Sequence, residues 1–169
     1  MKTPDITLTI ATDTGRFVAR YSEQGLAELN FPSAGRASSR TVEPKAVPAT
    51  IRHWHQATES ALKNILAGRS PKKFPPLAPA GTEFQKSVWN AMRKISLGRT
   101  KSYGEIAQAI GKPKAVRAVG GACGANPIPV LIPCHRVLAA KGKIGGFSSG
   151  LDRKRDLLAR EGVSLPSAG

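Results

Sequence analysis

Residues 82–122 of this chain read TEFQKSVWNAMRKISLGRTKSYGEIAQAIGKPKAVRAVGGA. Residues 82–85 and 102–105 both have the form of a capping box, in which Thr or Ser is followed three residues later by Gln or Glu. Each box precedes apolar residues at helical spacing, and Gly111 is placed to end the second helix. A third helix is expected at 113–123, where a proline occupies the first turn. The stretch therefore predicts three short helices, of which the last two form a helix-turn-helix.

The third predicted helix carries one long side chain, Arg117, among the small residues Ala115, Ala118 and Gly120. A glycine inside a helix costs about 1 kcal/mol relative to alanine, so helix propensity does not explain two adjacent glycines. A helix this slim can approach another surface closely. That surface is either a narrow groove of DNA or the packed core of the protein itself, and this segment alone favours neither.

The N-terminal half contains three short β-prone runs, at 6–11, 16–21 and 26–31, separated by turn-forming residues. These runs predict a small antiparallel sheet. Apolar residues then recur at helical spacing from 51 to 66, ahead of a glycine that can end a helix. The expected fold class is an α/β N-terminal domain, in which one helix covers the sheet, followed by a mainly α, winged-helix-like C-terminal domain that holds the helix-turn-helix.

A proline-rich stretch at 70–81 separates the two halves. Each proline removes an amide donor and biases the residue before it away from the helical conformation. We therefore expect a linker there, and domains at 1–78 and 79–169. Residues 33–48 are rich in Ser, Pro and Arg with little apolar content, which predicts a mobile surface segment.

The chain of 169 residues has 26 Lys and Arg against 11 Asp and Glu, a net charge of +15. Residues 81–169 hold 15 of the basic and 5 of the acidic residues, so +10 of this charge belongs to the C-terminal half. A surplus of this size favours a polyanionic partner. Nucleic acid is the first candidate and an anionic membrane surface is the second.

The only cysteines are Cys123 and Cys134, too few for a disulfide scaffold or an all-Cys zinc site. A reducing, cytoplasmic location is the simplest interpretation. The first residues include a proline and an acid where a signal peptide would be apolar, and no apolar run approaches the ~18 residues of a membrane span. We therefore expect a soluble protein that has no membrane partner.

Residues 126–137, NPIPVLIPCHRV, carry the clearest chemical signal. Three prolines stiffen a strand-like apolar segment that delivers Cys134, His135 and Arg136, and such rigidity suits a fixed nucleophile. A nearby base or cation would raise the thiolate fraction of Cys134. Neighbours on a strand point to opposite faces, however, and an isolated cysteine is often a small buried hydrophobe. From the residues alone, a role of Cys134 as nucleophile and a role as buried packing residue are equally supported.

Together these motifs resemble the O6-alkylguanine-DNA alkyltransferase family, also called the methylated-DNA–protein-cysteine methyltransferases. The resemblance covers residues 81–163, and residues 1–80 resemble the family only in layout. It is carried by six segments: GTEFQ at 81–85, SYGEIA at 102–107, RAVGGA at 117–122, NP at 126–127, PCHRV at 133–137 and LLAREG at 157–162.

The resemblance implies a DNA-repair protein that acts once. Cys134 would take a methyl or other alkyl group from O6 of guanine, and also from O4 of thymine, after the base is flipped out of duplex DNA. His135 would act on Cys134 through a water, Glu161 would hold His135, and Asn126 would support the sulfur. Tyr103 would assist departure of the guanine. The family needs no cofactor, and we predict none here and no metal.

The resemblance also implies two binding surfaces. Arg117 would fill the gap left by the flipped base, from a helix in the minor groove, with little sequence specificity. We expect a cytoplasmic monomer, associated with the nucleoid when bound to DNA, and cooperativity on DNA is left open. The residues expected at the DNA are Ser102, Tyr103, Ala115, Arg117, Ala118, Gly120 and Arg136, and those expected at the alkylated base are Val137, Gly146, Phe147, Ser148 and Ser149.

The alternative function is a helix-turn-helix DNA-binding regulator in which Cys134 only senses redox or alkylation state. Basic charge and capped helices fit both functions. The combination of Asn126, Cys134, His135 and Glu161 fits only alkyl transfer.

Overall fold

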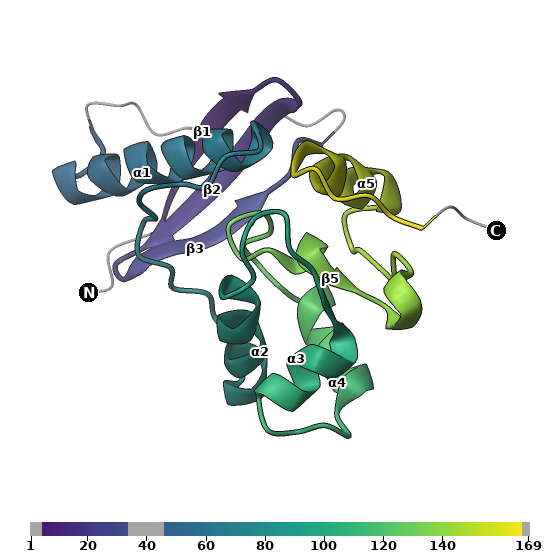
Figure 1. Cartoon of the computed structure of the whole chain (residues 1–169). Coiled ribbons are helices and arrows are strands. Elements are labelled where there is room, and N and C mark those ends of the chain that lie inside the picture. Colours follow the sequence, from purple (N-terminus) through teal and green to yellow (C-terminus); the bar gives the residue numbers. More distant parts are fainter. Residues whose placement is uncertain (1–4, 34–45, 167–169) are drawn as a thin grey trace.

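The computed structural model describes residues 5–33 and 46–166. Most of the segment predicted to be mobile, at 34–45, lies outside the described residues. Figure 1 shows two parts: a sheet with one long helix, and below it a group of short helices, with the last helix of the chain beside both.

The N-terminal part is the predicted three-stranded sheet and its covering helix. Strands β1 (Ile6–Thr12), β2 (Gly15–Ser22) and β3 (Gly25–Asn30) are antiparallel and lie in chain order. Helix α1 (Ala49–Leu66) packs on β1 and β3 and buries its apolar stripe there (Figure 1). The helix ends as predicted, because Gly68 adopts the left-handed conformation with a φ of 73°.

Both capping boxes form in the C-terminal part. The Thr82 hydroxyl accepts from the Gln85 amide at 3.1 Å, and the Gln85 side chain accepts from the Thr82 amide at 3.0 Å, at the start of α2 (Glu83–Arg93). Ser102 and Glu105 repeat this exchange at the start of α3 (Tyr103–Ala109). Helices α2, α3 and α4 (Val116–Gly124) pack on one another, and α5 (Leu151–Arg160) follows later in the chain.

The third predicted helix begins later than expected. Its start at Val116, rather than at 113, follows from a turn in which the Ala115 amide donates to the Lys112 carbonyl at 2.9 Å. The proline therefore belongs to this turn and not to the first helical turn.

The prediction of a strand that delivers Cys134 is wrong. Residues Cys134–Arg136 form a short 3-10 turn, η2, and Val130 before it has a φ of 74°, which no strand permits. The chain becomes extended only at β5 (Val137–Leu138), which pairs in parallel with β4 (Lys101–Ser102). A second 3-10 turn, η3 (Ala140–Gly142), follows. The prolines remove the amide donors that a continuous strand would need.

The predicted linker is itself bonded to the sheet. The Leu26 amide of β3 donates to the Pro76 carbonyl and the Ala78 amide donates to the Leu26 carbonyl, both at 2.8 Å. The buried core also runs without a break from the sheet into α2 and α4. The division at 78/79 stays a prediction.

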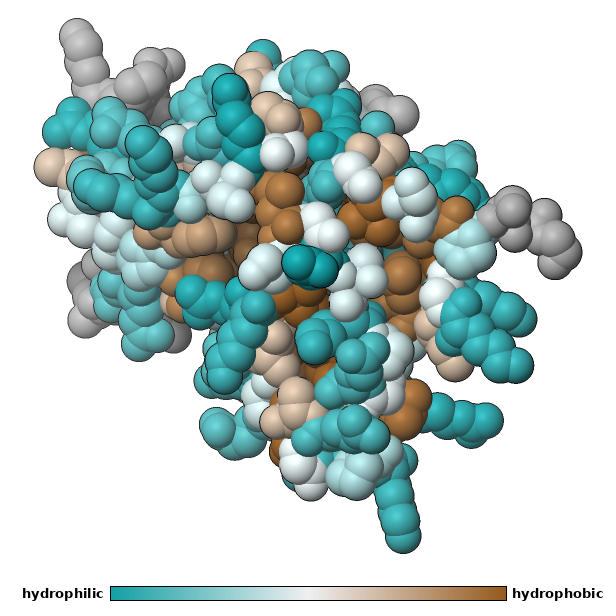
Figure 2. All heavy atoms as spheres, in the orientation of Figure 1, coloured by the Kyte–Doolittle hydropathy of each residue, from teal (hydrophilic) through white to brown (hydrophobic). Residues whose placement is uncertain are grey.

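Hydrophilic side chains project around α2, α3 and α4, at the lower end of the molecule in Figure 2. Among the described residues, no helix is both long enough and apolar enough to cross a membrane.

Candidate active site

Cys134 lines a pocket of about 310 Å³. Its side chain is nearly buried, with 8% of the residue exposed. The start of α3, the end of α4 and the loop at 143–150 supply the remaining walls. The lining residues are Tyr103, Gly120, Cys123, Gly124, Cys134, Gly146, Phe147 and Ser148.

Glu161 joins the two residues that follow Cys134. Its carboxylate lies 3.1 Å from His135 Nε2, and Arg136 Nε donates to it at 2.7 Å. Arg136 also donates to the Ile95 carbonyl at 2.7 Å. All three charged or polar side chains are buried, so the 3-10 turn and the end of α5 are locked together by charge-assisted hydrogen bonds.

This geometry fixes the tautomer of His135. A carboxylate only accepts hydrogen bonds, so Nε2 carries the proton and Nδ1 has the free lone pair. Burial lowers the pKa of His135 more than the Glu161 carboxylate raises it, so the imidazole is neutral at neutral pH. Nδ1 is buried and has no hydrogen-bond partner within residues 5–33 and 46–166. The ring is therefore able to accept a proton at Nδ1.

The thiol of Cys134 is protonated at rest. Burial raises its pKa, against a hydrogen bond from Asn126 and the charge of Lys154, both of which favour the thiolate. Asn126 is held in turn, because its Nδ2 donates to the Ile132 carbonyl at 2.8 Å and its Oδ1 accepts from the Ile128 amide at 2.9 Å. A buried base that is next in sequence to such a thiol is a candidate to deprotonate it, directly or through a water.

Lys154 is a residue that the sequence interpretation missed. It is fully buried, and its Nζ donates to the Val137 carbonyl at 2.7 Å and to the Gly146 carbonyl at 2.9 Å. Burial lowers the pKa of Lys154 to about 8, although the charges of the two cysteines act to raise it. Its place on α5 was a usable signal, because position 154 shares the apolar helix face of Leu157 and Leu158. Lys154 thus ties the pocket loop to the strand that follows Cys134.

Tyr103 stands directly after the N-cap of α3 and forms one side of the pocket. Burial raises the pKa of its phenol. The pocket loop passes close above it, since a Cβ on Gly145 would meet the Tyr103 hydroxyl at 3.0 Å. Phe147 of the same loop packs edge-on against Phe31 of the N-terminal part, with ring centroids 6.1 Å apart.

One face of helix α4 presents small residues outward. Arg117 and Ala118 are exposed, and a Cβ on Gly120 or Gly121 would meet no atom within 4 Å. Tight packing in the core is therefore not the reason for these glycines. The slim face of α4 is available to an external surface.

Several residues expected at the DNA or at the base make contacts within the protein that the sequence did not indicate. Arg136 is buried and paired with Glu161, and its expected DNA contact stays a prediction. Val137 has no exposed surface, and its expected contact with the base stays a prediction. Ser149 lies in the loop but does not line the pocket, and the Ser102 hydroxyl is used in the helix cap. The spacing of residues along the sequence did not indicate these contacts.

Comparison with known proteins places this arrangement in a family. A family model described as "6-O-methylguanine DNA methyltransferase, DNA binding domain" matches residues 83–163. A methylated-DNA–protein-cysteine methyltransferase of Methanosarcina acetivorans is 45% identical over 148 residues, which are 88% of this chain and 92% of that protein. The chain belongs to the methylated-DNA–protein-cysteine methyltransferase family.

Solved structures of methyltransferases agree with the whole fold. The crystal structure of Mycobacterium tuberculosis OGT in complex with DNA is 35% identical, with a TM-score of 0.72 and coverage of 92% of both chains. A crystal structure of the O6-methylguanine methyltransferase from the same organism is 36% identical, has a TM-score of 0.72 and covers 98% of this chain and 97% of that one. The fold class and the family resemblance predicted from the sequence are confirmed.

The Escherichia coli K12 bifunctional transcriptional activator/DNA repair enzyme Ada is 47% identical over 152 residues, and the match spans 43% of that protein.

Proposed function

We propose that this chain repairs alkylated duplex DNA by moving an alkyl group from O6 of guanine, or O4 of thymine, to Cys134. The sulfur–carbon bond forms as the carbon–oxygen bond breaks, and the base leaves as an anion that takes up a proton. The product is a thioether, which has no easy leaving path, so each chain acts once. Family membership and the pocket around Cys134 support this function.

The observation that carries the proposal is the orientation of His135. Glu161 holds Nε2–H and leaves Nδ1 as a buried acceptor on a neutral ring next in sequence to a protonated thiol. One water between Nδ1 and Cys134 would pass the thiol proton to His135, and Glu161 would stabilise the imidazolium that forms. Asn126 and Lys154 favour the same thiolate from other sides.

The opposite side of the pocket serves the leaving base. The Tyr103 phenol stays protonated at neutral pH, because burial raises its pKa, and can donate to the base as negative charge develops there. Ser148, in the loop that closes the pocket, would lie near O6. No cofactor takes part in this proposal.

The guanine must leave the duplex to reach Cys134, at a cost of a few kcal/mol that is smaller for a damaged pair. We assign the filling of the gap to Arg117, which is exposed on the slim face of α4. Contact through Ala115, Ala118 and Gly120 in the minor groove gives little sequence specificity. The basic charge of the C-terminal half makes the binding strongly salt-dependent. The protein would act as a cytoplasmic monomer.

An Arg117→Ala variant is expected to lose far more activity on duplex DNA than on a free O6-alkylated guanine base, because only the duplex requires extrusion. The measurement is the single-turnover transfer rate on both substrates. Arg155→Ala, which removes an exposed arginine of α5, is the matched control. Equal losses on duplex and free base would contradict the assignment.

Transfer itself is tested by mixing the wild-type chain with an excess of duplex DNA that carries labelled O6-methylguanine. The label on protein is expected to rise in a burst and stop at one methyl group per chain, with the added mass on the peptide that contains Cys134. Continued turnover, or label on another peptide, would overturn the proposal.

The alternative of a helix-turn-helix regulator is not favoured, because relatives that match most of the chain carry the methyltransferase name. A regulator would protect a preferred DNA sequence and leave the lesion unchanged.

A further inference from the structure

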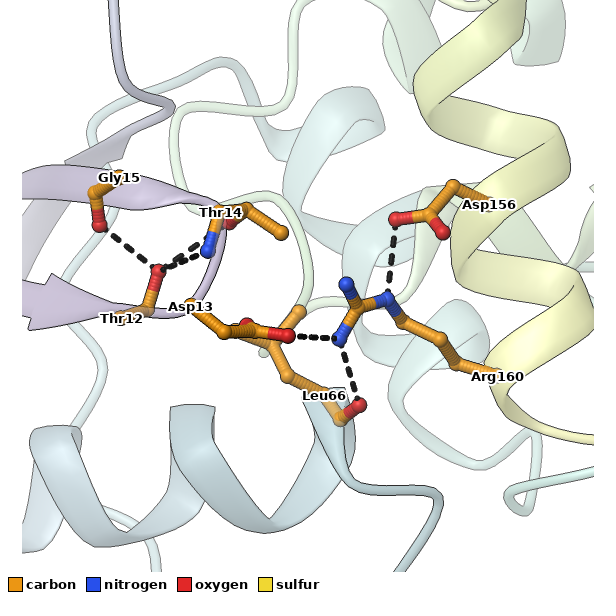
Figure 3. Close-up of polar contacts among 7 residues, drawn as sticks. All are labelled: Thr12, Asp13, Thr14, Gly15, Leu66, Asp156 and Arg160. Atoms are coloured by element: carbon orange, nitrogen blue, oxygen red, sulfur yellow. Dashed lines mark hydrogen bonds and ion pairs between the residues drawn. The ribbon is translucent and has the colours of Figure 1, made fainter.

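Arg160, the last residue of α5, connects the active site to the N-terminal part of the chain. Its Nη1 donates to Asp13 in the turn between β1 and β2 at 3.1 Å and to the Leu66 carbonyl at the end of α1 at 3.0 Å (Figure 3). Its Nε donates to Asp156 of its own helix at 2.9 Å. One guanidinium therefore holds three elements together.

Both N-terminal partners are suited to this contact. The Leu66 carbonyl is one of those that a helix leaves without an intrahelical donor, and a cation is favourable at this end of a helix. The turn that presents Asp13 is ordered by Thr12, whose hydroxyl donates to the Gly15 carbonyl at 2.7 Å and accepts from the Thr14 amide at 3.2 Å (Figure 3). These hydrogen bonds order the turn that carries the Asp13 carboxylate.

The backbone at the end of α5 packs against two segments that each carry a glycine. A Cβ on Gly68, just after α1, would lie 2.4 Å from the Arg160 carbonyl oxygen, so the two backbones meet without room for a side chain. On the other side, a Cβ on Gly98 would lie 3.4 Å from the Glu161 carbonyl oxygen. Residues 160 and 161 therefore sit between the N-terminal part and the segment before β4.

The next residue after Arg160 is Glu161, which sets the tautomer and position of His135. Any rotation at the end of α5 would move the Glu161 carboxylate relative to the imidazole. We propose that Arg160 is a positioning residue, through which the N-terminal part sets the placement of Glu161 and hence the rate of alkyl transfer. The inference rests on the proposed function of Cys134 and His135.

A contribution to folding stability alone does not explain the contact between Arg160 and Asp13. The Asp13 side chain is 64% exposed and that of Arg160 is 23% exposed, and ion pairs of this kind contribute little to folding. A shift in a supporting residue can still slow a reaction strongly, because rate depends steeply on the placement of the reacting groups.

The test uses the full chain with the variants Arg160→Met, Arg160→Lys and Asp13→Asn, and measures the single-turnover rate at saturating methylated duplex together with the Kd for that duplex. Arg160→Met is expected to lower the rate on the order of ten-fold with little change in Kd. Arg160→Lys should restore part of the rate, since a lysine can still reach one partner. Asp13→Asn, on an exposed turn, should slow the rate without any effect on folding.

Arg155→Met is the matched control, because Arg155 lies on the same helix and pairs with Asp152 within it. Its rate should equal that of the wild type. A wild-type rate in both Arg160→Met and Asp13→Asn, or an equal loss in Arg155→Met, would overturn the inference while leaving the proposed function intact. Failure of the wild-type chain to take up any methyl group would instead overturn the proposed function.

Discussion

A Cys134→Ala variant is expected to take up no methyl group from methylated duplex DNA. The second thiol in the pocket, Cys123, cannot replace it, because burial raises the pKa of Cys123 to about 12 and its Sγ is engaged with Met92 Sδ at 3.4 Å. The thiol form is a poor nucleophile. The measurement is protein-bound label after incubation with an excess of labelled duplex.

Cys123→Ala is the matched control, and it should still reach one methyl group per chain. DNA binding is expected to persist in Cys134→Ala although methyl transfer is lost, because the substitution removes no exposed side chain. Its Kd for the methylated duplex should therefore remain close to that of the wild type. Protein-bound label in Cys134→Ala would show that another residue accepts the group.

A Glu161→Gln variant is expected to lose both stability and activity. The charge of Arg136 would remain buried without its carboxylate, and breaking a buried pair in this way costs about 3–5 kcal/mol of unfolding free energy. His135 would keep a neutral amide acceptor but would lose the carboxylate charge that stabilises its imidazolium, and loss of general base catalysis slows a reaction by roughly 10²-fold or more. Urea denaturation and single-turnover transfer measure the two effects. Asp152→Asn, which removes an exposed carboxylate of α5, should leave both nearly unchanged.

The stability difference should depend on pH. Burial raises the pKa of the Glu161 carboxyl, but the hydrogen bonds from His135 and Arg136 outweigh burial and leave the pKa below its ordinary value. A carboxyl with a lowered folded pKa stabilises the protein fully above its unfolded pKa, about 4.3, and loses this contribution as pH falls through the folded pKa. The difference in unfolding free energy between the wild type and Glu161→Gln should therefore be largest at neutral pH and should become smaller below pH ~4. A gap that widens in acid would contradict the paired state of Glu161.

Features set by neighbours in the sequence were predictable. The capping boxes at Thr82 and Ser102 need only residues within one helical turn, and they form as expected. The three strands alternate with turn residues, so their positions were also predictable. The motif around Cys134 identified the family, although the local structure there is a 3-10 turn and not a strand.

Features set by distant partners were not predictable. In the sequence Arg136 is one more cation of a basic chain, and only the fold brings Glu161, 25 residues later, against it. The partners Arg160 and Asp13 lie 147 residues apart. Burial of a charge such as Lys154 follows from how α5 packs, which no local pattern determines.

The short parallel ladder between β4 and β5 holds together the part of the pocket wall that carries the phenol and the thiol. Lys101 pairs with Val137 and Ser102 with Leu138, so the backbone that carries Tyr103 is bonded to the backbone that follows Cys134. The loop at 143–150, another part of the pocket wall, is glycine-rich and contributes the side chains of Phe147 and Ser148. Substitutions in that loop can alter which alkyl groups fit while the phenol and the thiol keep their spacing. Substrate range can thus drift over evolution, or be engineered, without a matching redesign of the chemistry.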